Sequence, residues 1–105
     1  MNNGYEEISP EEIRKRIHKG EKLSIIDVRE PQEVAEGTIP DAENIPLGEL
    51  LTRLNNIDKD KEHIIVCRSG NRSGLASEWL TDRSYQVKNM TGGMLKWNEE
   101  EQDMQ

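Results

Sequence analysis

Residues 64–73 read Ile64-Ile65-Val66-Cys67-Arg68-Ser69-Gly70-Asn71-Arg72-Ser73, a β-branched run that ends at the chain's single cysteine. Such an apolar run is typical of a buried strand, and the glycine-containing turn after it leads into a helix-like stretch. Cys67 is therefore expected at the C-terminal end of a strand, beside a helix N-terminus and between Arg68 and Arg72. Positive charge from a helix N-terminus and from arginines favours a thiolate. The pattern predicts a nucleophilic cysteine rather than a small buried hydrophobe.

The turn that follows Cys67 has the composition of an anion-binding loop. Gly70 and Asn71 both tolerate positive φ, so the turn can direct successive backbone N–H groups inward. Surroundings of this kind lower a cysteine pKa from about 8.5 to between roughly 3.5 and 7.5. Arg72 is expected to bind an incoming oxyanion through two parallel hydrogen bonds. Arg68 is compatible with either the site or the solvent.

The chemistry predicted for this loop starts from a nucleophile that is already ionised. Both histidines, His18 and His63, lie outside the loop, so no general base is adjacent to Cys67 in the sequence. Sulfur transfer fits this arrangement, because a thiolate can accept a sulfur atom as a persulfide and pass it on. Two distant histidines and one thiol form no recognisable zinc motif, so no metal is expected.

The composition indicates a small acidic domain. The chain has 105 residues, 32% of them hydrophobic and none of them Phe, with a net charge of -7. Such a charge disfavours nucleic acid, whose phosphates require a basic face. A single cysteine, an N-terminus without signal-peptide character and the lack of a long apolar run favour the cytoplasm and no membrane partner. The arginines beside the thiol then suit a small anionic substrate.

Apolar periodicity predicts helices and strands that alternate along the chain. The first half of the chain is expected to form a helix from Ser9 to Gly20 opened by a Ser-Pro-Glu-Glu cap, then strand 23–28, short helix 30–36, strand 42–45 and a helical stretch at 47–54. The second half is expected to form strand 64–66, a helix with Leu75, Ala76, Trp79 and Leu80 on its core face, strand 86–89 and a last helix with Leu95 and Trp97. This alternation predicts a parallel sheet with helices on both faces and a ligand site at its carboxyl end. We expect one domain over residues 1–105, with a core at 5–98 and a frayed acidic tail at 99–105.

Four stretches, in the same order, resemble the motifs of single-domain rhodaneses, the thiosulfate sulfurtransferases. Residues 67–73 resemble the active-site loop of that family. The other three stretches are Asp27-Val28-Arg29-Glu30-Pro31-Gln32-Glu33, Gly37-Thr38-Ile39-Pro40-Asp41-Ala42-Glu43-Asn44-Ile45-Pro46 and Gly92-Gly93-Met94-Leu95-Lys96-Trp97. The similarity covers nearly the whole chain.

This resemblance implies a three-layer α/β rhodanese domain with five strands in a central parallel sheet. It also implies that Cys67 carries sulfur as a persulfide, and that Asp27 and Arg29 support the active-site end of the sheet. The loop that binds substrate would comprise Arg68, Ser69, Gly70, Asn71, Arg72 and Ser73. The implied reaction moves sulfane sulfur from a small anionic donor such as thiosulfate to a thiol, to cyanide or to a protein acceptor. A protein could equally be the donor, and the reaction needs no cofactor.

Three residues depart from the family pattern. Thr38 stands where His is common, and Asp41 where Gly is common. Neither change touches the nucleophile, so we expect altered turn geometry and retained activity. Ser84 precedes Tyr85 where the family often has Gly, which predicts a strained or differently capped helix end.

Two other functions stay open. Dual-specificity cell-cycle phosphatases resemble rhodaneses but place five residues between cysteine and arginine, whereas four separate Cys67 from Arg72. The shorter loop makes a smaller cradle, which suits sulfur better than the tetrahedral anion of a phosphatase or an arsenate reductase. A non-enzymatic persulfide carrier or a protein-binding adaptor on the same scaffold is the third hypothesis, because a fold does not fix a function.

Overall fold

The computed structural model describes residues 4–104, which contain a central sheet of five parallel strands. The strands are β1 (Glu6–Ile8), β2 (Ser24–Asp27), β3 (Glu43–Asn44), β4 (Glu62–Val66) and β5 (Gln86–Met90), in the spatial order β1-β5-β4-β2-β3. The helices are α1 (Pro10–His18), α2 (Pro31–Val34), α3 (Asn71–Asp82) and α4 (Gly93–Asp103), with 3-10 helices η1 (Leu47–Thr52) and η2 (Leu54–Asn56). The predicted α/β class with a parallel sheet is confirmed.

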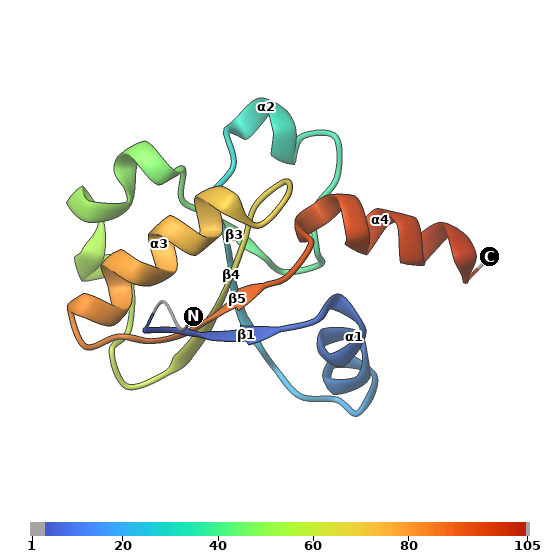
Figure 1. Ribbon diagram of the computed structural model, residues 1–105, viewed down its shortest axis with the longest axis horizontal. Helices are drawn as coiled ribbons and strands as arrows, with labels where there is room; N and C mark the ends of the chain where they lie inside the picture. Colours follow the sequence, from blue (N-terminus) through green and yellow to red (C-terminus); the bar gives the residue numbers. More distant parts are fainter. Residues whose placement is uncertain (1–3, 105) are drawn as a thin grey trace.

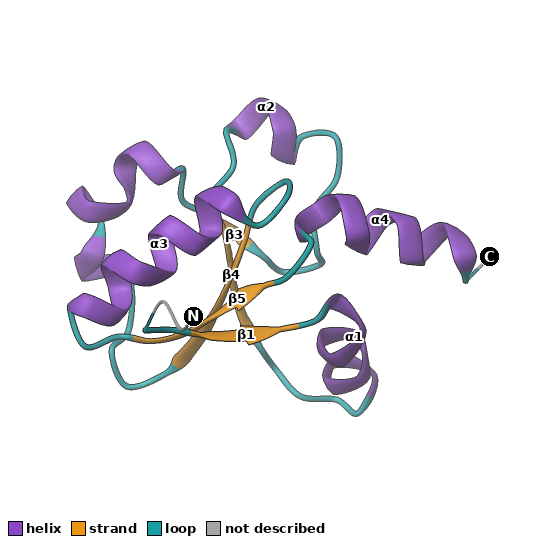
Figure 2. Cartoon of the chain, viewed as in Figure 1, coloured by secondary structure: helices purple, strands orange, loops and turns teal. Residues whose placement is uncertain are grey.

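Helices cover both faces of the sheet (Figure 1), as the colouring by secondary structure also shows (Figure 2). Alternate residues of β2 face opposite layers, because side chains alternate along a strand. Ile25 packs in the cluster that holds Ile13 of α1 and Trp97 of α4. Ile26 packs in the other cluster, with Leu80 of α3. Burial on both faces explains why the inner strands read as continuous apolar runs.

The carboxyl ends of β2 and β4 meet at one edge of the sheet. Asp27, the last residue of β2, is paired with Val66, the last residue of β4. Cys67 follows Val66 directly and Arg29 follows Asp27 by two residues, so both segments leave the sheet at the same edge. Ligands bind at this edge of parallel sheets, so the topology places the predicted site where chemistry is expected.

The start of α1 follows the predicted cap. The Ser9 hydroxyl accepts a hydrogen bond from the Glu12 backbone N–H at 3.1 Å, and Pro10 occupies the first helical position. The Glu12 carboxylate forms an ion pair with Arg16, one turn further along the same helix, at 3.3 Å. The serine therefore fixes the beginning of this helix.

Three features differ from the sequence expectations. The edge strand β1 was not predicted, because it has three residues and one buried side chain, Ile8. It is too short to show an alternation of apolar and polar residues. The leucine-rich stretch that begins at Leu47 forms two 3-10 helices, whose tighter winding leaves Leu51 exposed. Leu75 was wrongly assigned to the core face of α3: its exposed fraction is 41%, whereas Ala76 is fully buried.

The acidic residues expected to fray belong to α4, which continues to Asp103. Arg14 of α1 holds them, with its guanidinium 2.7 Å from the Glu100 carboxylate and 3.0 Å from that of Glu101. The same guanidinium donates to the Trp97 carbonyl at 2.6 Å and lies 3.9 Å from the centre of the Trp97 ring. These contacts fasten the C-terminal helix to α1.

Two of the residues that depart from the family pattern adopt left-handed backbone conformations. Asp41 has φ 67° and Ser84 has φ 70°. Ser84 lies just past the end of α3, where its N–H donates to the Thr81 carbonyl and the Tyr85 N–H donates to the Leu80 carbonyl, both at 3.0 Å. This is the position that glycine usually fills after a helix, so a side chain here is strained.

None of the helices within residues 4–104 has the length and apolar character needed to cross a membrane.

Candidate active site

The segment after β4 forms a tight loop that ends at the first turn of α3. Cys67 has no exposed surface, while Arg68 and Ser69 are exposed. Gly70 has φ 106°, as expected for the turn residue, and its carbonyl accepts the Gly74 N–H at 2.9 Å. Asn71 is not among the residues with positive φ and instead begins α3. The helix N-terminus therefore lies directly beside the sulfur.

The N-terminus of α4 holds the loop from the other side. The Met94 N–H donates to the Cys67 carbonyl at 2.8 Å, and the Leu95 N–H donates to the Arg68 carbonyl at 3.0 Å. Gly93 makes this approach possible, because a Cβ at Gly93 would lie 2.3 Å from the Arg68 carbonyl oxygen. Its φ of 61° is also a conformation that glycine adopts without strain. Gly93 therefore allows the backbones of α4 and of the cysteine loop to approach each other closely.

Hydrogen bonds converge on the Cys67 sulfur. The Gly70 N–H donates to Sγ at 3.0 Å, and the Ser73 hydroxyl lies 3.2 Å from the same atom. Burial by itself raises the pKa of this thiol, but hydrogen bonds from the Ser73 hydroxyl and from the backbone N–H groups of Ser73, Gly70 and Ser69 outweigh it and lower the pKa. The loop therefore stabilises a thiolate, which is the reactive form of cysteine.

Asn89 of β5 is a buried site residue that sequence reasoning missed. Its Oδ1 accepts a hydrogen bond from the Ser73 hydroxyl at 2.5 Å, and its Nδ2 donates to the Gly70 carbonyl at 3.3 Å. The Gly70 contact fixes which end of the amide faces Ser73. Ser73 has one hydroxyl proton, so the Cys67 sulfur and Asn89 Oδ1 compete for it. The sequence signal that could have identified Asn89 is a polar residue within a buried strand.

Arg72 points to α2 rather than to an open anion site. Its two terminal nitrogens lie 2.7 and 2.8 Å from the two carboxylate oxygens of Glu33. Arg72 lowers the pKa of Glu33 to about 2, with a further contribution from the Glu30 backbone N–H. Glu33 in turn raises the pKa of Arg72. The sequence predicted that Arg72 binds an oxyanion of the substrate, whereas in the structure Arg72 binds the Glu33 carboxylate.

Asp27 and Arg29 brace the turn that carries Glu33. Arg29 Nη2 donates to the buried Asp27 carboxylate at 2.8 Å and to the Gly37 carbonyl at 2.8 Å. Arg29 Nη1 donates to the Glu33 carbonyl at 3.3 Å. Thr38, which replaces the histidine common in the family, donates its hydroxyl to Asp27 at 2.7 Å. These residues hold α2 in place beside the cysteine loop and have no hydrogen bond to Cys67 within residues 4–104.

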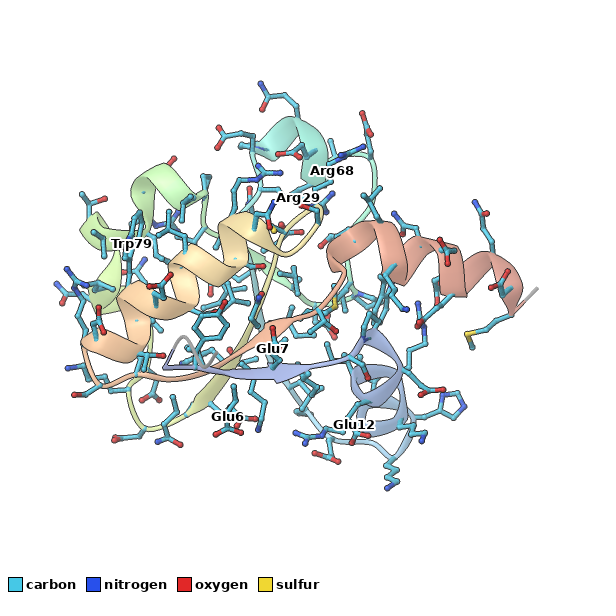
Figure 3. The ribbon with its side chains drawn as sticks, viewed as in Figure 1. Glu6, Glu7, Glu12, Arg29, Arg68 and Trp79 are labelled. Atoms are coloured by element: carbon cyan, nitrogen blue, oxygen red, sulfur yellow. The ribbon has the colours of Figure 1, made fainter. Side chains whose placement is uncertain are left out.

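Figure 3 shows Arg68 and Arg29 at the same end of the sheet. Arg29 is buried in its ion pair, whereas Arg68 is exposed and forms no ion pair with any residue that the structure describes. Asn71 is also exposed on the first turn of α3. Of the predicted loop residues, Ser69, Gly70 and Ser73 therefore surround the sulfur. Arg72 is paired with Glu33, and Arg68 is the loop cation without an ion pair among the described residues.

The described part of the chain holds no group of three or more His, Cys, Asp and Glu side chains arranged for a metal ion. His63 is engaged in the fold: its ring nitrogens lie 2.6 Å from the Ser24 hydroxyl and 2.6 Å from the Asp58 carbonyl. The Cys67 thiolate, with the N–H donors around it, can attack an electrophilic sulfur and hold a charged adduct.

Comparison with known proteins places these features in a family. The sequence pattern of the rhodanese-like domain matches residues 9–100. "Putative sulfurtransferase YtwF" of Bacillus subtilis is 42% identical over 94 residues, which cover 90% of this chain and 91% of that protein. A "Sulfurtransferase" of Allochromatium vinosum is 38% identical over 92 residues, covering 87% of this chain and 86% of that protein.

Solved structures agree with the sequence comparison. The crystal structure of a rhodanese-related protein from Thermoplasma volcanium superposes with a TM-score of 0.85 at 32% identity, covering 91% of this chain and 93% of that chain. A rhodanese-like domain protein from Staphylococcus aureus superposes with a TM-score of 0.84 at 33% identity, covering 88% of this chain and 90% of that chain. The fold, the cysteine loop and these relatives agree: the chain belongs to the rhodanese-like domain family.

Proposed function

We propose that this protein transfers sulfane sulfur through a persulfide on Cys67, with thiosulfate as a competent donor and a thiol or cyanide as acceptor. The observation that carries the proposal is the set of backbone N–H donors of Ser69, Gly70 and Ser73 at one buried sulfur, with the Ser73 hydroxyl 3.2 Å from the same atom. Donors in this arrangement stabilise negative charge on the first sulfur. They are equally suited to the second sulfur of a persulfide anion.

The reaction needs two displacements at sulfur. In the first, the Cys67 thiolate attacks the outer sulfur of thiosulfate, the S–S bond of thiosulfate breaks, and sulfite leaves with the electron pair. Cys67 is left as a persulfide anion. In the second, the acceptor nucleophile attacks the outer sulfur of the persulfide, and the thiolate leaves with the electron pair. No general base is needed, because the nucleophile enters the reaction ionised.

The assay is thiocyanate release from thiosulfate and cyanide. We expect turnover by the parent protein and none above background by Cys67→Ser, whose hydroxyl is neither ionised at neutral pH nor able to form a persulfide. Ser77→Ala is the matched control, because Ser77 is buried on α3 one turn beyond Ser73 and has no hydrogen bond to the sulfur. Equal turnover by Cys67→Ser and the parent would falsify the proposal.

A persulfide carrier that serves a protein partner is the second candidate. Its support is the complete burial of Cys67, which leaves the sulfur without exposed surface for a free small donor. A relative in Bacillus subtilis named "Putative sulfur carrier protein YrkF" is 37% identical over 92 residues, covering 87% of this chain and 50% of that protein. Persulfide formation without turnover on small acceptors would favour this role. The phosphatase alternative has less support, because Glu33 occupies the arginine that would bind phosphate.

A further inference from the structure

We propose that Glu33 makes the site select sulfur donors by charge. It would favour donors whose sulfane sulfur is attached to an uncharged group, such as an alkyl persulfide, over the thiosulfate dianion. This inference rests on the proposed function, because it names the class of donor that the Cys67 site takes best. The observation behind it is that the arginine expected to attract anions already holds one, supplied by the chain itself.

The Glu33 carboxylate occupies the two-nitrogen face of the Arg72 guanidinium. Each carboxylate oxygen lies within 2.8 Å of a different terminal nitrogen, so the pair has the two-pronged geometry that an oxyanion substrate would otherwise adopt. The side chains are 34% and 30% exposed, which places the pair at the surface of the protein rather than in its core. A donor anion would have to displace this carboxylate before it could bind both terminal nitrogens of Arg72 side by side.

Glu33 is held in that position by its surroundings. Its carboxylate also accepts the Glu30 backbone N–H at 3.0 Å, and its carbonyl accepts a hydrogen bond from Arg29. Arg29 is fixed in turn by the buried Asp27 carboxylate. Because the carboxylate is already ordered, its ion pair with Arg72 costs less side-chain entropy than an ordinary surface pair.

The charges near the sulfur cancel one another. The Arg72 pKa is raised first by Glu33, and the charges of the Cys67 thiolate and Glu30 raise it further, so these groups lie within electrostatic reach of the guanidinium. Glu33 and Glu30 therefore oppose the charge of Arg72, while Arg68 is exposed and has no ion pair with a described residue. An acidic chain with a net charge of -7 adds no long-range attraction for an anion. The sequence suggested a basic pocket, but this region has little net positive charge.

The transfer step itself is the same for either donor. With an alkyl persulfide, the Cys67 thiolate attacks the outer sulfur, the S–S bond breaks, and the alkyl thiolate leaves with the electron pair while the proton stays on the outer sulfur. With thiosulfate, the leaving group is sulfite, which carries two negative charges. The selection therefore comes from the charge of the donor and not from a different reaction.

The test compares two alkylating agents that differ in charge. Iodoacetate is an anion and iodoacetamide is neutral, and the ratio of their rates at Cys67 cancels any change in thiolate population or loop access. Glu33→Gln keeps the shape of the side chain and removes the charge. We expect the iodoacetate-to-iodoacetamide ratio to rise about threefold to tenfold, and the increase to shrink in concentrated salt.

Two matched variants separate charge from position. Glu36→Gln removes a charge from the exposed end of the same segment and should leave the ratio unchanged. Glu33→Asp keeps the charge but shortens the side chain, and its ratio should stay close to that of the parent. A ratio that is unchanged or lower in Glu33→Gln would overturn the proposal, as would a ratio in Glu33→Asp equal to that in Glu33→Gln.

A second arm uses two sulfur donors, thiosulfate and the persulfide of 2-mercaptoethanol, with persulfide formation read by intact mass. Glu33→Gln should accelerate sulfur uptake from the thiosulfate dianion more than uptake from the persulfide, which carries at most one negative charge. If the parent takes sulfur from neither donor, the proposed function fails, while the alkylation ratio still decides whether Glu33 selects by charge.

Discussion

At the scale of single residues, Ser73 is the side chain that most directly sets the reactivity of Cys67. Its hydroxyl lies 3.2 Å from Sγ, and its hydrogen bond lowers the pKa of the thiol. In Ser73→Ala that donor is lost, so we expect the thiol pKa to rise. The rate of alkylation by iodoacetamide should then reach its plateau at higher pH than in the parent.

Ser77→Ala is the control for this measurement, and it carries a stability prediction of its own. Within residues 4–104, the Ser77 hydroxyl is the buried side-chain oxygen that has no hydrogen-bond partner. Removing such a group relieves a desolvation cost of about 1–3 kcal/mol, so Ser77→Ala should be at least as stable as the parent in urea. It should leave the alkylation profile unchanged. A shift of the profile equal to that of Ser73→Ala would contradict the role of the Ser73 hydroxyl.

Ser84 tests the cost of a side chain in a left-handed conformation. With φ 70° it occupies the position after α3 that glycine usually fills. Ser84→Gly should stabilise the protein by about 0.5–1 kcal/mol, since relief of strain exceeds the entropy lost by glycine. Thr81→Gly, inside the same helix, should instead destabilise it by about 0.3 kcal/mol through helix propensity alone. Urea unfolding measures both, and equal effects of the two changes would refute the assignment of strain to Ser84.

At the scale of elements, the contact between α4 and the cysteine loop depends on Gly93. A Cβ in Gly93→Ala would meet the Arg68 carbonyl at 2.3 Å, so α4 would have to move away from the loop. We expect a loss of roughly 1–3 kcal/mol in unfolding free energy and slower alkylation of Cys67. Gly48→Ala is the matched control, because nothing lies within 4 Å of its added Cβ. Equal stability of the two variants would show that the close approach is dispensable.

The ion pair between Glu33 of α2 and Arg72 of α3 predicts a specific dependence of stability on pH. The folded-state pKa of Glu33 is about 2, below its ordinary value of 4.5, so the folded protein binds this proton less readily than the unfolded chain. The stability that Glu33 contributes is therefore present above pH 4.5 and is lost as the pH falls through about 2. The parent should exceed Glu33→Gln in urea midpoint near neutral pH, and the gap should close in acid. A gap that persists at pH 2 would exclude the ion pair as its source.

At the scale of the whole molecule, the sequence predicted the fold because each inner element carries its own local signal. Ser9 marked a helix start, and the apolar runs that end at Asp27 and Cys67 marked the two strands that place the site. The positive φ of Gly70 also followed from its residue type. These features depend on neighbours a few residues away, which a sequence displays directly.

The contacts that complete the site could not be predicted in this way. Arg72 meets Glu33 across 39 residues, and Ser73 meets Asn89 across 16. Both contacts depend on the spatial order of the strands and on the rotation of α2 and α3 around their axes. No spacing rule within one segment reports either quantity. Local patterns therefore indicated Cys67 as the candidate nucleophile, whereas the contacts around it required the assembled sheet.

A persulfide at Cys67 is the central intermediate of the proposed reaction, and intact-mass spectrometry after incubation with a sulfur donor tests for it most directly. The parent, treated with thiosulfate or with the persulfide of 2-mercaptoethanol, should gain the mass of one sulfur atom. Cyanide should remove that atom with release of thiocyanate, and Cys67→Ser should gain nothing. A parent protein that gains no sulfur from either donor, or a Cys67→Ser variant that gains as much as the parent, would contradict it.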